Sequence, residues 1–267
     1  MPIIERISRV LRFAHSGLGI RAKGICALLG IASPASYSSR PPLWGWPVPK
    51  VLEVTPSRLK GMSLRIDPHD WSQTVIYQEI FVDGAYDLSC VGFEPDHVVD
   101  CGGHIGLFSL LASSVFPGAT VTVFEPNPDN CARIRENCAL NGLKWDCRLA
   151  AVGSAAGEAY LDIVNSHSAR LSSDRGVRTT IIPLKDFISS LGPCTLVLKI
   201  DVEGEERAMW PELIPCLPEQ TVVFFETHHG DEGWFYAEEQ LRQHGFTVFR
   251  LVRRGQFCDG YAKRIAR

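Results

Sequence analysis

Residues 97–114 read HVVDCGGHIGLFSLLASS, and this stretch decides the fold. Its apolar beginning is typical of a short buried strand that ends at Asp100, and an apolar helix follows the glycines. Glycine removes side chains where a ligand must approach the backbone, and a helix N-terminus presents unpaired N–H groups. The stretch therefore predicts a strand, a tight loop and a buried helix beside a ligand site. The plainer alternative is a strand-to-helix turn that needs glycine only for packing.

A second unit follows directly at residues 119–142, ATVTVFEPNPDNCARIRENCALNG. It predicts a strand from Thr120 to Phe124 and a helix that begins after Asn127 as N-cap and stops at Asn141. Glu125 ends the strand, where its carboxylate can accept hydrogen bonds from both hydroxyls of a cofactor ribose. The alternative for Glu125 is an exposed acid that favours the helix dipole. Together the two units predict a nucleoside-type cofactor.

The remainder of the chain predicts one large α/β domain with an N-terminal arm. Strand-like and helix-like segments alternate beyond the two units, which is typical of a mostly parallel sheet. Residues 33–56 are instead rich in proline, serine and tryptophan, and repeated prolines exclude a continuous helix there. We therefore expect a helical and proline-rich arm over residues 1–69 and the main domain over residues 70–267. Residues 245–264 predict two final strands around a turn.

Charge and cysteine content indicate which partners and which cellular compartment to expect. The chain has 27 basic and 30 acidic residues and a formal net charge of −3, so no global field attracts nucleic acid. Its nine cysteines include no Cys-x-x-Cys pair, which indicates a reducing compartment, and we expect a cytoplasmic protein. The apolar run Ile25–Ile31 is far shorter than the roughly 20 residues that span a membrane.

The N-terminal arm offers two further hypotheses. Apolar residues fall at helical spacing between Ile3 and Leu11, with arginines beside them, which suits either peripheral contact with a membrane surface or packing on the main domain. Trp44 and Trp46 are candidates for a lid over the substrate, and burial against the domain is the alternative.

Four motifs give this sequence a specific resemblance. VVDCGGHIGLFSLLAS, TVFEPNP and LKIDVEGEE, with IFVDGAYD upstream of them, resemble the FkbM family of S-adenosylmethionine-dependent methyltransferases. The resemblance runs from about Asp70 to near the C-terminus. It departs from the commonest family loop at Cys101, Gly103 and His104.

The resemblance implies a fold, a cofactor and a set of binding residues. The fold is a Rossmann-like class I methyltransferase domain, a seven-stranded and mostly parallel sheet with an antiparallel C-terminal edge strand. The cofactor is S-adenosyl-L-methionine, and the reaction is O-methylation of a small hydroxylated acceptor such as a natural product, a sugar or a glycolipid. The implied cofactor-binding residues are Asp100, Gly102, Gly103, His104, Gly106, Glu125, Pro126, Asn127, Ala151 and Asp201. Ala151 would lie at the adenine edge, and packing of small residues is its alternative.

The chemistry is expected at the ends of two later strands, because open α/β sheets bind ligands beyond the carboxyl ends of their strands. Asp201 and Glu203 follow the predicted strand Thr195–Ile200, and His228 follows Thr221–Phe225. A histidine can accept the hydroxyl proton at neutral pH, and Asp201 or Glu203 can orient it. The alternative is that His228 is an ordinary loop residue.

Lys199 lies inside an apolar strand, where an unpaired charge would cost several kcal/mol. We therefore expect a carboxylate partner for it, either Asp201 or Glu226, and a role in positioning other groups. Further along, Trp234, Phe235 and Tyr236 can line a substrate wall or anchor the next helix, and we expect Phe235 to be an anchor.

Several alternatives to this function remain open. The spacing of the strand-end groups matches no metal motif, so we expect a site without a metal. A magnesium or manganese site would draw on Asp201, Glu203, Glu226 and His228. A nicotinamide-dependent oxidoreductase is opposed by His104, which stands where the dinucleotide fingerprint requires a glycine. A non-catalytic cofactor-binding module would not need the polar groups at the strand ends.

Overall fold

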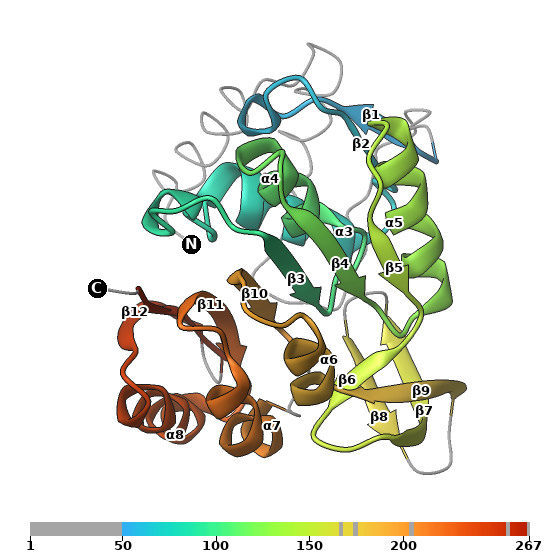
Figure 1. The fold of residues 1–267 in the computed structure, drawn as a ribbon. Helices are drawn as coiled ribbons and strands as arrows, with labels where there is room; N and C mark the ends of the chain where they lie inside the picture. The colour runs from blue at the N-terminus through green and yellow to red at the C-terminus, as the bar shows by residue number, and fades with distance from the viewer. Residues whose placement is uncertain (1–49, 166–167, 173–175, 203–205, 255–256, 266–267) are drawn as a thin grey trace, which may run out of the picture.

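A seven-stranded sheet forms the centre of the computed structural model, which describes residues 50–165, 168–172, 176–202, 206–254 and 257–265 (Figure 1). Its strand order is β5–β4–β3–β10–β11–β13–β12. In that order the strands span Asp146–Arg148, Thr120–Phe124, His97–Cys101, Thr195–Ile200, Gln220–Thr227, Phe257–Arg264 and Thr247–Arg254. The β13 strand is antiparallel to both of its neighbours, and the pairs from β5 to β11 are parallel. The predicted sheet is confirmed; its antiparallel C-terminal strand lies one place inside the edge strand β12.

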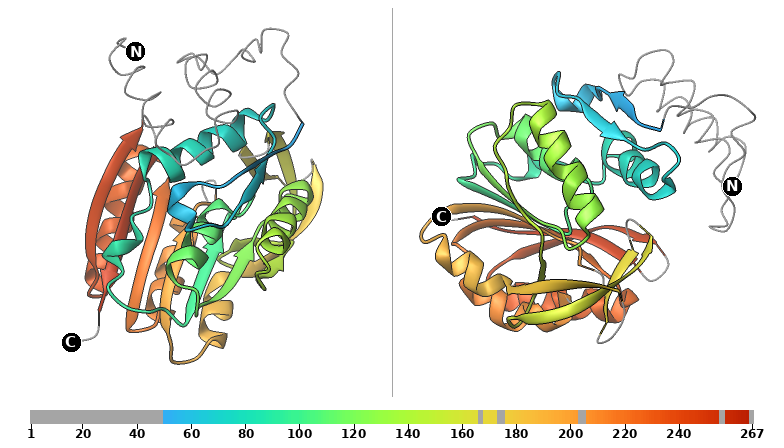
Figure 2. Two further views of the ribbon diagram at one scale, coloured as in Figure 1. Left: turned by 90° about the horizontal axis from the view of Figure 1, so that it is seen from above. Right: turned by 90° about the vertical axis from the view of Figure 1, so that its right-hand side faces the viewer.

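Helices cover both faces of this sheet (Figure 2). One face packs against α3 (Trp71–Tyr77), α4 (Leu107–Val115) and α5 (Pro128–Leu140), and the other packs against α6 (Leu184–Ser190), α7 (Glu206–Leu213) and α8 (Gly230–Gln243). Neighbouring residues of each strand therefore enter different cores. In β11, for example, Val222 and Phe224 pack on the first side and Val223 and Phe225 on the second. This explains why the central strands are apolar throughout rather than alternating.

The boundaries of the glycine-loop units follow their local signals. Strand β4 has the predicted bounds, and the side chain of Asn127 caps α5 by accepting a hydrogen bond from the Asp129 N–H at 3.0 Å. Pro128 occupies the first helical position, where its missing N–H leaves no partner unsatisfied. The helix ends at Leu140, with Asn141 of the predicted stop signal as its C-cap.

A second, four-stranded sheet lies beyond the end of β5. Its order is β6–β9–β7–β8, with bounds Ala151–Gly153, Val177–Pro183, Gly157–Asn165 and Ser168–Ser172. Ala151 pairs with Ile181 in this sheet and is only 7% exposed. These contacts place Ala151 in packed structure, as the alternative of small-residue packing predicts.

The described part of the N-terminal arm packs into the main core. A hairpin of β1 (Leu52–Val54) and β2 (Leu64–Ile66) lies against α5, and its apolar side chains join the cluster on that side of the sheet. The predicted boundary at residue 69 falls just before α3, and a π-helical turn, Gln78–Asp83, continues from α3. The predicted helix near Ile3 and the lid candidates Trp44 and Trp46 lie outside the described residues.

The first turns of α8 correct one expectation. Phe235 is 60% exposed, whereas Trp234 is 2% exposed and stacks on Phe225 with ring centroids 5.3 Å apart. Helical spacing turns Trp234, Ala237 and Leu241 to the sheet, so Phe235 points away from it. None of the helices formed by the described residues has the length and apolar character needed to cross a bilayer.

Asn137 should be a critical contact between the hairpin and the glycine loop. Its side chain is fully buried, accepts from the Arg65 N–H at 2.7 Å and donates to the Ile105 carbonyl at 3.0 Å. Asn137→Ala leaves both backbone groups unsatisfied, so we expect a loss of about 2–4 kcal/mol in the free energy of unfolding, measured in urea. Asn141→Ala, which breaks bonds to Ser63 at a half-buried position, should cost less. Equal losses would contradict this account.

Candidate active site

The glycine loop between β3 and α4 packs tightly on the protein itself. Gly102 and Gly106 have φ angles of 79° and 84°, and His104 also has a positive φ, of 50°. A Cβ atom on Gly102 would lie 1.9 Å from the carbonyl oxygen of Asp201, and one on Gly103 would lie 2.2 Å from the side chain of Val123. We expected glycine here so that a ligand can approach the backbone. The structure adds a second reason: the loop lies in close contact with Val123 of β4 and with Asp201 after β10.

Glu125 holds this loop from the end of β4. It is only 5% exposed; Oε2 accepts from the His104 N–H at 2.7 Å and Oε1 from the Asn127 N–H at 2.9 Å. Burial raises the pKa of Glu125 to about 7, although hydrogen bonds from Asn127, His104 and Asn130 act in the opposite direction. Oε1 also accepts from Asn130 Nδ2 at 3.4 Å, whereas Oε2 accepts only from the His104 N–H among the bonds described, so Oε2 can still accept a hydrogen bond from a ligand.

Lys199 joins the ends of β3 and β10. Its ammonium donates to the Gly102 carbonyl at 2.8 Å and lies 3.3 Å from Asp100 Oδ1 and 3.6 Å from Asp201 Oδ2. Burial alone would lower the pKa of Lys199, but Asp100 and Asp201 outweigh burial and raise it. The predicted partner Asp201 is confirmed. The shorter ion pair is with Asp100, which is fully buried and also accepts from Ser109 Oγ at 2.7 Å.

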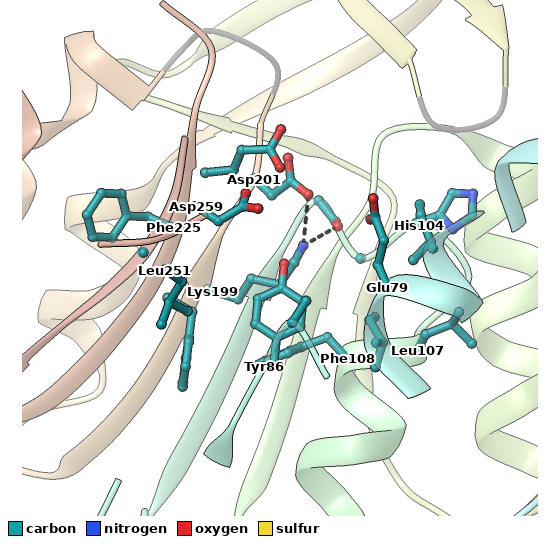
Figure 3. Close-up of a pocket in the computed structure, with 18 residues that line it drawn as sticks. Glu79, Tyr86, His104, Leu107, Phe108, Lys199, Asp201, Phe225, Leu251 and Asp259 are labelled. Carbon is teal, nitrogen blue, oxygen red and sulfur yellow. Dashed lines mark hydrogen bonds and ion pairs between the residues drawn. The ribbon is translucent and has the colours of Figure 1, made fainter. Parts of the chain in front are cut away.

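A pocket opens beyond the carboxyl ends of β10 and β11. Figure 3 shows Glu79, Asp201 and Asp259 around it, with Lys199 and the hydroxyl of Tyr86 between them. Four carboxylates and one ammonium line the pocket, and its wall includes Gly102, Gly103 and His104. Its apolar wall includes side chains from α3, α4, β11 and β12: Ile76, Leu107, Phe108, Phe224, Phe225 and Leu251.

Tyr86 presents its hydroxyl to these carboxylates. Its ring packs edge-on against Phe108 and Phe224, with centroids 5.0 Å and 5.7 Å away. Burial, and then the negative charges of Asp201 and Glu226, raise the pKa of Tyr86 well above its usual value. The phenol therefore stays protonated and can donate a hydrogen bond into the pocket.

A histidine between two carboxylates lies behind the pocket. His228 Nδ1 is 2.6 Å from Glu206 Oε1, and His228 Nε2 is 3.3 Å from Glu226 Oε1. The side chains of His228 and Glu206 are 8% and 3% exposed, whereas Glu226 is 23% exposed and lines the pocket. Ligand atoms of Asp201, Glu226 and His228 all lie within 4.8 Å of one another.

The predicted site residues thus divide into two groups. The pocket lining includes Gly102, Gly103, His104, Lys199 and Asp201, and His228 stands behind Glu226. The remaining predicted residues lie in or beside the supporting structure and do not line the pocket: Asp100, Gly106, Glu125, Pro126, Asn127 and Ala151. Glu203 lies outside the described residues.

Sequence reasoning missed three polar side chains of the pocket, Glu79, Tyr86 and Asp259. Tyr86 belongs to the IFVDGAYD motif, which could have drawn attention to it. Glu79 and Asp259 carry no local signal, because they come from the π-helical turn after α3 and from β13. They meet the strand ends only in the folded chain.

The sheet order, the two helical layers and the pocket at the strand ends define a Rossmann-like methyltransferase. A Streptococcus mutans protein described as a SAM-dependent methyltransferase shares this fold, with a TM-score of 0.51 and 10% identity over 83% of this chain and 57% of its own. The FkbM methyltransferase domain model matches residues 100–248, and the chain belongs to this family.

Two relatives illustrate how far the similarity extends. The chain is 29% identical over 218 residues to the 31-O-demethyl-FK506 methyltransferase FkbM of Streptomyces tacrolimicus, which covers 65% of this chain and 81% of that protein. It is 42% identical over 66 residues, a quarter of each chain, to methyltransferase sdnD of Sordaria araneosa.

Replacing Lys199 should show how strongly the unpaired charge of buried Asp100 destabilises the fold. Lys199→Met leaves Asp100 buried without its cation, so we expect a loss of about 3–5 kcal/mol in the free energy of unfolding, measured with urea. The double variant Lys199→Met/Asp100→Asn should recover part of this loss. The pKa of Lys199 is raised from 10.5 in the folded protein, so the stabilisation by its charge is fully present below pH 10.5. This stabilisation is lost as the pH rises through the pKa that Lys199 has in the folded protein. A double variant no more stable than Lys199→Met would contradict the pairing.

Proposed function

We propose that this protein transfers a methyl group from S-adenosyl-L-methionine to a hydroxyl group of a small molecule. The observation that supports this most is the position of the pocket: it joins the glycine loop, where class I methyltransferases bind their cofactor, to the polar ends of β10 and β11. Membership of the FkbM family supports the reaction class.

The residues present fit this cofactor. A sulfonium and an ammonium group give it two positive charges against one carboxylate, and the pocket offers four carboxylates to one ammonium. Glu125 Oε2 keeps acceptor capacity for a ribose hydroxyl beside the loop that this residue holds. Asp100 would act indirectly, by keeping Lys199 charged and in place beneath Gly102. We propose His104, Gly106, Pro126 and Asn127 as the frame of this binding site.

The protein's own contribution to the reaction is alignment and removal of a proton. When bound, S-adenosylmethionine supplies an electrophilic methyl group, and its sulfur takes up the bonding electron pair. The strand-end group of Asp201, Glu226 and His228 would hold and activate the acceptor hydroxyl, whose proton leaves to a pocket carboxylate as the new C–O bond forms. Tyr86 can donate a hydrogen bond to a second oxygen of the acceptor.

The acceptor class follows from the relatives and from the pocket wall. The name of the Streptomyces tacrolimicus relative describes a methyltransferase acting on an O-demethyl form of FK506. The apolar wall and the carboxylates together suit a natural product or a glycolipid that carries both a carbon skeleton and hydroxyl groups. We propose such a hydroxylated small molecule as the substrate.

Calorimetric titration with S-adenosylhomocysteine tests the cofactor assignment. We expect binding in the micromolar range, which corresponds to roughly −8 kcal/mol, and no binding of NAD under the same conditions. Binding of NAD without binding of S-adenosylhomocysteine would contradict the proposal and favour an oxidoreductase.

Glu125 should make this affinity depend on pH. A ribose hydroxyl would donate to the ionised carboxylate, and the pKa of Glu125 is raised to about 7, so affinity should increase as pH rises from 6 to 8. The Glu125→Gln variant should bind more weakly and lose this part of the pH dependence, while titration of the ligand itself remains in both proteins. Identical pH profiles for the two proteins would exclude the ribose contact.

The group at the end of β11 should affect turnover more than binding. His228→Ala should bind S-adenosylhomocysteine as the wild type does but lose roughly 10²–10⁴-fold in methyl transfer, measured as S-adenosylhomocysteine release in a screen of hydroxylated acceptors. The exposed neighbour His229 provides a matched control, and His229→Ala should retain activity. Equal activity of wild type and His228→Ala would remove His228 from the proposed role.

A further inference from the structure

We propose that Asp201, Glu226 and His228 form a binding site for a divalent cation of the magnesium and manganese class, at the back of the pocket. Their ligand atoms lie within 4.8 Å of one another. For metal–ligand bonds of about 2.1 Å, octahedral geometry separates adjacent ligands by about 3.0 Å and opposite ligands by about 4.2 Å. Small side-chain adjustments therefore suffice to bring the three groups around one ion.

The contacts of His228 support a metal ligand in particular. Its Nδ1 lies 2.6 Å from the buried carboxylate of Glu206, so an Nδ1–H donated to Glu206 leaves the Nε2 lone pair directed at the pocket side. A carboxylate that fixes the second ring nitrogen is the usual companion of a metal-binding histidine. Glu206 would thus set the tautomer and ring orientation required for coordination.

The Nε2 atom faces Glu226 Oε1 at 3.3 Å. Two lone pairs at this distance repel each other unless a proton or a cation lies between or beside them. A single proton can bridge His228 and Glu226. However, Asp201 also has a ligand atom within 4.8 Å of both residues, so a second carboxylate approaches the same point. Three donors that converge in this way suit a cation with several coordination positions.

The charge of the pocket favours the same conclusion. Four carboxylates and Lys199 line it, and the charge of Lys199 is also shared by the buried Asp100. The proposed cofactor adds one net positive charge, which leaves an excess of negative charge at the strand ends. A divalent cation on Asp201 and Glu226 would offset two of these negative charges and still leave Glu79 and Asp259 around the acceptor.

The cation's role in the reaction rests on the proposed function, whereas its binding does not. An acceptor hydroxyl drawn to the cation would lose its proton more readily, because the positive charge stabilises the resulting alkoxide. The proton would leave to a carboxylate outside the ligand set, such as Asp259. The methyl group then forms its bond to this oxygen as the carbon–sulfur bond breaks.

Manganese binding to the metal-stripped full-length protein tests the site directly. Loss of the free Mn²⁺ signal in electron paramagnetic resonance should report one saturable site in the wild type, and Mg²⁺ should compete for it. Asp201→Asn and Glu226→Gln should each weaken Mn²⁺ binding by at least roughly ten-fold, and Glu206→Gln by roughly 10–100-fold through loss of the orienting charge. Thermal unfolding of each variant checks that it is folded.

Glu79→Gln is the matched control, because it removes one negative charge from the same pocket without removing a proposed ligand. It should leave Mn²⁺ binding nearly unchanged. An equal loss in Glu79→Gln and Asp201→Asn would overturn the proposal, because binding would then follow pocket charge alone. Absence of saturable Mn²⁺ binding, with and without S-adenosylhomocysteine, would also overturn it. Titration of the same samples with S-adenosylhomocysteine separates this failure from failure of the proposed cofactor.

Discussion

A buried ammonium group connects the parts of this fold that build the pocket. Lys199 lies in the central strand β10, and its charge is neutralised by Asp100 on β3 and Asp201 at its own strand end. The same ammonium donates to the Gly102 carbonyl and so ties the glycine loop to the sheet. A buried charge is stable only when its partners are held in place, and this requirement restricts how the two strands and the loop can be arranged.

The glycine loop is also held by hydrogen bonds to the end of β4. Glu125 reaches from the end of β4 to the His104 N–H, and the Phe124 carbonyl accepts from the N–H groups of Gly102 and Gly103. The loop is therefore held by β4 and β10 together. A preorganised loop spends little conformational entropy when a ligand binds, which is an advantage for a site that must align two reactants.

The polar groups of the pocket are carried by a sheet that is apolar on both faces. In central strands buried by helices on each side, a charge needs a buried partner, as Lys199 and Asp100 provide for each other. The other polar groups of the pocket gather at the carboxyl ends, as Asp201, Glu226 and His228 do. The carboxylates outnumber the single ammonium there, so a cationic ligand would find complementary charge. Family membership and this charge balance are consistent with a cationic cofactor at the site.

Much of this protein was determined by local sequence alone. The strand bounds of β4 and β10, the caps of α5 and the two C-terminal strands all follow from short-range hydrophobic patterns, glycines and capping residues. The family motifs identified the methyltransferase class, because the glycine loop is one continuous run of residues and the acids after β10 are another. Such features depend on backbone conformation and on neighbours a few residues away, which a sequence displays directly.

Only the tertiary structure decided which side chains meet. Glu79 and Tyr86 meet Asp259, from a distant part of the chain, in one pocket, and Asp100 rather than Asp201 makes the shorter ion pair with Lys199. The exposure of Phe235 and the burial of Trp234 depend on the rotation of α8 about its axis. The placement of His228 behind Glu226, with Glu206 on its far side, depends on the packing of α7 against β11. Contacts of this kind arise from distances between elements, and no local pattern encodes those distances.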